Sequence, residues 1–110
     1  MKLYLDTSTS TTLLKLDDKE YTWESGRDLA EKLHAFVRDK LAENGKTWTD
    51  ISEIIYMAGP GSFTGLRIGA AFVNALASEL SIPLFNHKGE KVKIILPEYG
   101  AGANITAPKK

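Results

Sequence analysis

Hydrophobic and polar residues alternate over three short runs at the start of the chain, at positions 3–7, 13–16 and 20–23. This two-residue period is typical of strands that bury one face. Asp17, Asp18 and Lys19 form a turn signal between the second and third runs. The pattern therefore predicts a three-strand antiparallel meander.

A helical period replaces the alternation after Ser25. Its apolar positions are Leu29, Leu33, Phe36, Val37 and Leu41. Ser25 has the side chain of an N-cap, Asp28 suits the first turn, and Gly45 suits the position after the last turn. We expect an amphipathic helix between Ser25 and Gly45, which needs no special function.

The second half of the chain begins with the continuous apolar run 54–58, typical of a central strand covered on both faces. A glycine loop, GPGSFTGLRIG at 59–69, leads into a predicted second helix over 64–80. Residues 83–85 and 92–96 are predicted as two further strands. Together these elements indicate an α/β fold class with a mixed sheet, one domain over 1–97 and a flexible tail over 98–110.

The composition excludes several function classes. Among 110 residues, 14 basic side chains balance 14 acidic ones, so no overall field attracts nucleic acid or an anionic membrane. The absence of cysteine excludes disulfides, thiolate metal sites and cysteine nucleophiles. Neither a signal peptide nor roughly 18 consecutive apolar residues can be found, and a cytoplasmic location with no membrane contact is expected.

The glycine loop does not match either common nucleotide motif. A phosphate loop of the Walker type requires Gly-Lys-Ser/Thr, whereas Leu66 follows Gly65 here. The dinucleotide fingerprint requires a glycine where Thr64 stands. Two readings stay open: a generic anion site in which Ser62 and Thr64 lie at a helix N-terminus, or a tight turn whose glycines permit close packing.

A second candidate for phosphate or nucleotide binding is Asp6 with the following hydroxyls, Ser8 and Thr9 among them. Actin-like phosphotransferases place an acidic residue and a glycine-containing turn here, but this turn has neither glycine nor lysine. A hydroxyl-rich β-turn satisfied by its own backbone is the alternative. His34 and His87 make no metal-binding pair, so no metal site and no catalytic residue is predicted.

The second helix carries more apolar surface than one sheet requires. Its apolar arc spans about 220°, whereas about 100° suffices to seat a helix. Such surface on a small domain indicates partner binding, although burial under the first helix is the alternative. The predicted partner-binding residues are Gly59, Gly61, Phe63, Gly65, Leu66, Ile68, Gly69, Phe72, Val73 and Leu76. We expect Gly65 and Gly69 to admit a neighbouring backbone, and Gly69→Arg to abolish partner binding without unfolding the chain.

Three stretches together resemble one family: LYLDTSTS near the N-terminus, LAENGKTWTDISEIIYMAGPGSFTGLRIGAA, and LASELSIPLF. Over residues 1–86 the chain is similar to the N-terminal domain of the TsaB family, also called YeaZ. The resemblance implies half of an actin-like, Hsp70-like ATPase fold of the RNase H-like type, with two main helices.

The resemblance also implies a function, in the synthesis of N6-threonylcarbamoyladenosine (t6A) in tRNA. TsaB-like proteins are noncatalytic subunits that bind the transferase TsaD through their N-terminal helices and work with the ATPase TsaE. This chain would then hold no cofactor, with ATP and magnesium used by other subunits, and would meet tRNA only indirectly. The alternatives are an actin-like nucleotide-binding module and a homo-oligomeric regulatory protein, and a homodimer could form on the same surface.

The chain also departs from the family pattern. TsaD-like subunits carry a His-x-x-x-His pair on the first helix, whereas this chain has His34 alone. The stretch FNHKGEKVKIILPEYG stands where relatives continue with another helix and a second domain. We expect a minimal, single-domain version, in which any function of the second domain is in question.

Overall fold

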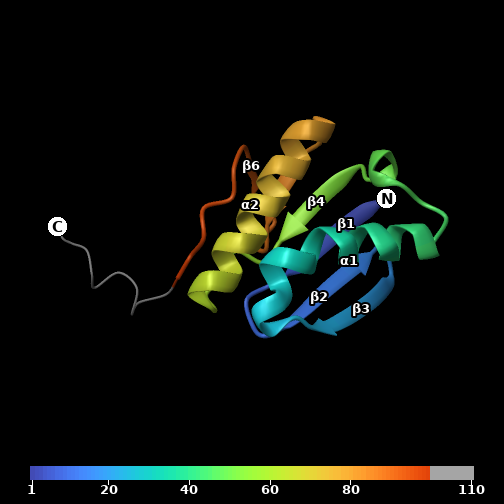
Figure 1. The fold of residues 1–110 in the computed structure, drawn as a ribbon. Helices are drawn as coiled ribbons and strands as arrows, with labels where there is room; N and C mark the ends of the chain where they lie inside the picture. The colour runs from blue at the N-terminus through green and yellow to red at the C-terminus, as the bar shows by residue number, and fades with distance from the viewer. Residues whose placement is uncertain (100–110) are drawn as a thin grey trace.

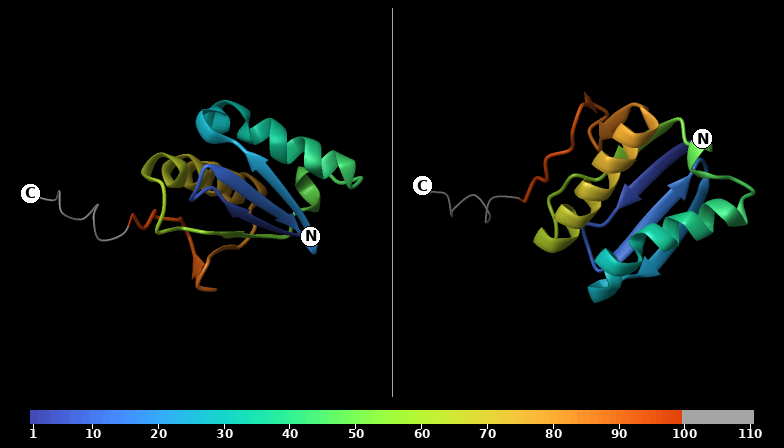
Figure 2. Two further views of the ribbon diagram at one scale, coloured as in Figure 1. Left: turned by 90° about the horizontal axis from the view of Figure 1, so that it is seen from below. Right: turned by 45° about the horizontal axis from the view of Figure 1, so that its top comes forward.

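A computed structural model describes residues 1–99 as a six-stranded mixed sheet with two long helices lying over one face (Figures 1 and 2). The strands are β1 (Lys2–Asp6), β2 (Thr11–Leu16), β3 (Lys19–Glu24), β4 (Glu53–Tyr56), β5 (Leu84–Asn86) and β6 (Lys91–Val92). The helices are α1 (Leu29–Glu43) and α2 (Phe63–Leu80), with short 3₁₀ helices η1 (Gly26–Asp28) and η2 (Trp48–Asp50). Their arrangement confirms the α/β class with a mixed sheet.

The sheet has the strand order β3-β2-β1-β4-β5-β6. The predicted meander is confirmed, because β1 pairs antiparallel with β2 and β2 with β3. β4 then pairs parallel with β1, and β5 parallel with β4. Because β1 and β4 are parallel neighbours, the Asp6 turn and the glycine loop emerge at the same edge of the sheet.

The core lies between the sheet and the helices. Leu3, Leu5 and Ile54 are fully buried on the strands, and Leu33 and Val37 meet them from α1. Alternate strand residues point away from the helices, which is why the meander shows a two-residue period.

Two strand predictions are wrong in detail. β4 is buried on the helix side only, since Ile55 on its other face is half-buried rather than covered. The predicted strand over 92–96 is reduced to β6, because the chain bends after Val92. Beyond it, Ile95 is buried, whereas Ile94 and Leu96 are 54% and 72% exposed.

Helix α1 begins three residues later than its sequence signals suggest. Ser25 starts η1 without a capping bond, and its buried hydroxyl lies 2.8 Å from the Thr12 hydroxyl instead. The other end follows the prediction: Gly45 has φ +69°, and its amide and that of Lys46 bond back to the last turn.

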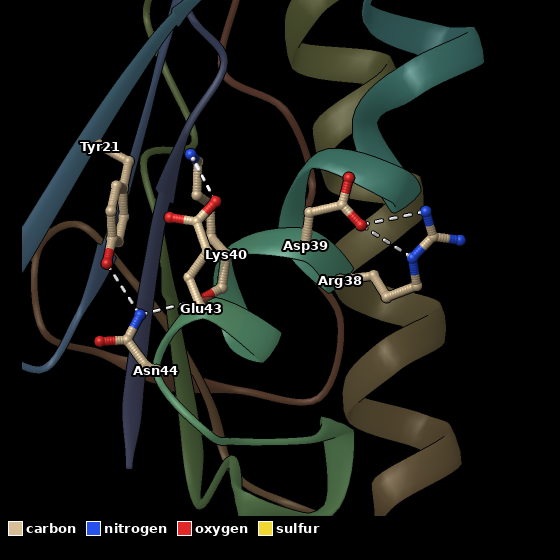
Figure 3. A network of polar contacts seen from close by, with 6 residues as sticks. All are labelled: Tyr21, Arg38, Asp39, Lys40, Glu43 and Asn44. Atoms are coloured by element: carbon tan, nitrogen blue, oxygen red, sulfur yellow. Dashed lines mark hydrogen bonds and ion pairs between the residues drawn. The ribbon is translucent and has the colours of Figure 1, made fainter.

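Polar contacts fasten the C-terminal end of α1 to the edge of the sheet. In Figure 3 the Asn44 side chain points toward Tyr21 of β3, and its amide donates to the Tyr21 hydroxyl at 2.7 Å. The outward residues of α1 pair with one another, Arg38 with Asp39 at 3.1 Å and Lys40 with Glu43 at 3.0 Å. The outer face of α1 is therefore charged.

Most of the predicted tail, residues 100–110, lies outside the described residues. Glu98 belongs to the part of the predicted tail that is described, and its amide donates a hydrogen bond of 2.7 Å to the Ala58 carbonyl.

Candidate protein–protein interface

Helix α2 begins with the serine predicted near its cap. Ser62 is the N-cap, and its hydroxyl accepts a bond of 3.2 Å from the Gly65 amide. The helix ends at Ser81, which has a left-handed conformation. The residues that α2 buries are Gly65, Leu66, Gly69, Ala70, Val73 and Ala77.

Several predicted partner residues therefore face the interior of this chain. Leu66 and Val73 are fully buried, and Gly65 and Gly69 are packed against the strands. A Cβ at Gly65 would overlap the Thr7 carbonyl, and one at Gly69 would overlap the Thr7 and Tyr56 hydroxyls. Gly65 thus admits the backbone of Thr7, directly after β1, and Gly69 admits the side chains of Thr7 and of Tyr56 on β4, all in the same chain. From these contacts we expect Gly69→Arg to disrupt the packing of α2 on the sheet, and not to leave the fold intact.

The two earlier glycines of the loop also serve internal contacts. Gly59 is buried with φ +130°, and a Cβ there would overlap the Glu98 carbonyl. A Cβ at Gly61 would overlap Ser8. These contacts place Gly59, Gly65 and Gly69 in the interior of the described chain and not on a partner surface, whereas Gly61 is exposed although it packs closely on Ser8.

A buried hydroxyl cluster holds α2 against the sheet. The Thr7 hydroxyl lies 2.7 Å from the Tyr56 hydroxyl and 2.7 Å from the Gly65 carbonyl. The Tyr56 hydroxyl donates to the Leu66 carbonyl at 3.2 Å. Burial is the main cause that raises the pKa of Tyr56 to about 12, while the bond to Thr7 lowers it and the charge of Asp6 raises it.

Four of the five proposed anion-binding residues, Asp6, Ser8, Thr9 and Ser62, already make hydrogen bonds within the chain. Asp6 Oδ1 accepts from the Ser8 amide at 2.8 Å and from the Ser8 hydroxyl at 2.6 Å. The Thr9 hydroxyl donates to the Thr11 carbonyl, and Ser62 caps α2. The hydrogen bonds at Asp6, Ser8 and Thr9 satisfy the polar groups of this turn from within the turn itself. Within residues 1–99, no three His, Cys, Asp or Glu side chains are grouped as metal ligands.

The remaining apolar residues of α2 reach the surface. Phe63 is 55% exposed at its N-terminus, and Ile68, Phe72 and Leu76 are half-buried along its length. The Phe63 ring lies against the Tyr99 ring in a tilted arrangement, with ring centroids 4.5 Å apart. The structure thus divides the ten predicted partner residues into a packed set and a surface set.

An apolar groove of about 380 Å³ lies between α1 and α2. It is lined by His34, Trp48, Phe72, Ala75, Leu76, Glu79 and Leu80. The Trp48 ring is 5.0 Å from the His34 ring and 6.4 Å from the Phe72 ring, measured between centroids. We define this set of seven residues as the α1–α2 groove.

Sequence reasoning missed the part of this groove that comes from outside the two helices. Trp48 lies on η2, where the Thr47 and Asp50 side chains and amides bond reciprocally in a capping box. The Thr47 amide donates to Asp50, which is the main cause that lowers the pKa of that carboxyl. The Thr-Trp-Thr-Asp stretch carries the capping signal, but its position against α2 depends on the fold.

A second open hollow, of about 660 Å³, lies on the other side of α2. Its walls include Thr64, Arg67 and Asn74 of α2 and the extended segment after β6. The Asn74 amide donates to the Ile95 carbonyl at 3.1 Å, and its oxygen accepts from the Ile95 amide at 2.7 Å. Thr64, one of the proposed anion-binding residues, is exposed, and it lines this hollow together with the cationic side chain of Arg67.

The family model for "TsaD: tRNA N6-adenosine threonylcarbamoyltransferase" matches residues 23–86, which is more than half of the chain. The chain is 38% identical over 58 residues to the tRNA threonylcarbamoyladenosine biosynthesis protein TsaB of Escherichia coli (strain K12), covering 53% of this chain and 25% of that protein. It is also 51% identical over 47 residues to a tRNA N6-adenosine threonylcarbamoyltransferase of Pyrobaculum aerophilum, covering 43% of this chain and 14% of that protein.

Solved structures agree with the family match. YeaZ from Pseudomonas aeruginosa superposes with a TM-score of 0.68 at 34% identity, covering 77% of this chain and 42% of that chain. The chain thus spans less than half the length of each of these relatives. The sheet and helices are those of an actin-like, RNase H-like fold. The chain belongs to the TsaD family of threonylcarbamoyltransferase homologues, within its TsaB/YeaZ branch.

Proposed function

We propose that this chain is a noncatalytic subunit of the tRNA threonylcarbamoyladenosine machinery, which binds a TsaD-like transferase. The observation that carries the proposal is the α1–α2 groove, an open apolar surface on a chain whose other outward helix face is charged. Matches to TsaB proteins support the pathway.

The balanced charge of the chain favours binding to a protein partner over direct binding to tRNA. With 14 basic and 14 acidic residues, the chain offers no excess of positive charge to phosphates. In the proposed assembly, tRNA, ATP and magnesium are held by other subunits, a TsaE-like ATPase among them. No helix among residues 1–99 is long and apolar enough to cross a membrane, and we propose that the assembly works in the cytoplasm.

Co-expression with the TsaD-like protein of the same genome tests the proposal. Size-exclusion chromatography should show one co-eluting complex that contains both chains. Separate elution of two folded proteins would overturn the assignment. A homodimer that excludes TsaD would instead support a homo-oligomeric protein.

The competing function, a nucleotide-binding module, has weaker support in the geometry. Its candidate ligands Asp6 and Ser8 bond to each other, and Ser62 caps its own helix. Calorimetry with ATP and magnesium on the isolated chain separates the two functions. Micromolar affinity would favour the module, and absence of heat the scaffold.

A further inference from the structure

Both long helices lie on one side of the sheet, and neither covers the opposite face, which we call the bare face (Figure 2). Parallel strands in the middle of a sheet are usually covered on both faces. β4 lies between two parallel neighbours, β1 and β5, and its sequence is the continuous apolar run typical of such burial. Ile55 is nevertheless only half-buried, so a second layer on the bare face would complete the burial of β4.

The bare face carries a row of side chains that crosses all six strands in register. Each member pairs with the next on the neighbouring strand, and such cross-strand partners share a face. From β3 to β6 this cross-strand row consists of Glu20, Lys15, Tyr4, Ile55, Phe85 and Lys91. The row is therefore acidic at the β3 edge, apolar in its middle and basic at the β6 edge.

The two ends of the row are open to a partner. The Glu20 side chain is 61% exposed, and only its Oε2 approaches Lys15, at 3.5 Å. Lys91 is exposed, and no carboxylate of residues 1–99 lies within ion-pair distance of it. In the left view of Figure 2 the β5–β6 hairpin, drawn in orange, extends from the sheet away from the helices. Lys91 is thus carried toward the side that a second layer would occupy.

We propose that a second copy of this chain covers the bare face, with the two sheets packed face to face about a twofold axis that runs along the strands. This axis reverses the cross-strand row in the second copy. Lys91 of each copy then meets Glu20 of the other, and Tyr4 meets Ile55 in the middle. A twofold axis across the strands would instead place Glu20 on Glu20 and Lys91 on Lys91, and repulsion between like charges disfavours it.

The size of the bare face sets the strength of this dimer. Five strand spacings of about 4.8 Å, and strands of two to six residues, give a surface of roughly 24 Å by 15 Å per copy. Standard interfaces bury about 800 Å² per partner, so this smaller face supports a reversible dimer and not an obligate one. We expect association in the micromolar range.

The inference is independent of the proposed function. The α1–α2 groove lies on the helix side of the sheet, so a dimer through the bare face leaves the groove of both copies open. A TsaD-like subunit and a second copy could therefore bind the same chain at once.

Charge reversal at the two ends of the row tests the proposal. Glu20→Lys and Lys91→Glu each bring like charges together at both ends of the dimer. Glu31→Lys makes a matched change at an exposed position of α1, and Ala75→Trp fills the α1–α2 groove. Circular dichroism and thermal melts first establish that the four variants are folded. Sedimentation velocity over roughly 5–500 μM then measures self-association, a range suited to a small interface.

The wild type should dimerise reversibly, and Glu31→Lys and Ala75→Trp should dimerise like it. Glu20→Lys and Lys91→Glu should each weaken association about 10-fold or more at about 0.05 M salt, and less at about 0.5 M salt because exposed charges are screened. An equimolar mixture of these two variants should associate like the wild type, because a mixed dimer again brings opposite charges together at both ends.

Three results would overturn the inference. One is a wild-type chain that stays monomeric over the whole range. Another is a dimer that Ala75→Trp abolishes and the charge reversals leave unchanged, which would assign self-association to the groove. The third is a mixture of Glu20→Lys and Lys91→Glu that associates no better than either variant alone. Failure of a dimerising wild type to bind the TsaD-like subunit would overturn the proposed function and leave this inference standing.

Discussion

Gly69→Ala tests whether the glycine signature serves internal packing. The new Cβ would overlap the Thr7 hydroxyl and the Tyr56 hydroxyl, which are both buried and lie 2.7 Å apart. Overpacking a core by one methyl group costs about 2 kcal/mol. Displacing a buried hydroxyl from its partners costs about 2 kcal/mol more. Alanine returns about 1 kcal/mol of helix propensity, so the net loss is about 3 kcal/mol.

Equilibrium urea unfolding followed by tryptophan fluorescence measures this loss. The midpoint should fall with little change in the slope, and Tm should drop by roughly 12 °C or more in a domain of this size. Ala71→Gly, at an exposed position of the same helix, measures the propensity contribution alone and should cost about 1 kcal/mol.

The reasoning is refuted if Gly69→Ala is as stable as the wild type or more stable. That result would mean that the sheet and α2 separate enough to accept a methyl group, and the glycine would again be available to a partner. A combined Gly69→Ala and Tyr56→Phe variant adds a further check, because removing one of the overlapped hydroxyls should make the two losses less than additive.

Three further changes probe the surroundings of α2. Asn74→Ala removes both bonds to Ile95, so we expect hydrogen exchange of the Ile95 amide to accelerate and stability to fall by about 1–2 kcal/mol in urea unfolding. Ser62→Ala removes the N-cap and should cost about 1 kcal/mol, whereas Ser62→Asp should retain most of it. Burial raises the pKa of Tyr56 from 10 to about 12 in the folded state, so the neutral phenol stabilises the fold. This contribution to the free energy of unfolding is complete below pH 10 and is lost as the pH rises from 10 to 12. Tyr56→Phe should therefore show a shallower fall of the urea midpoint over that range, and an equal fall in both proteins would contradict the assigned pKa.

The meander shows how much local pattern can predict. Each of its strands buries one face, so alternation in the sequence is visible, and the turn at Asp17 joins neighbours in space. Ser25 shows the limit of such reasoning. It has the right chemistry for a cap, but a tertiary contact with Thr12 takes its hydroxyl, and α1 begins later.

The candidate site divides in the same way. Phe63, Ile68, Phe72 and Leu76 could be identified from the wide apolar arc of α2 alone, and the structure leaves them at the surface. The contribution of Trp48 to the α1–α2 groove could not be predicted, because it depends on the tertiary contact between η2 and α2.

The sequence by itself determined the elements of this protein, their order and its family, since periodicity and the glycine signature are written along the chain. Only the tertiary structure decided what the glycines are for. A glycine permits a close approach without specifying the neighbour. Parallel pairing of β1 with β4 brings Thr7 and Tyr56 under Gly69, and the bend after β6 brings Glu98 over Gly59. The contact surface that we propose consequently lies in the groove between the helices, where residues distant in sequence meet, and not in the loop.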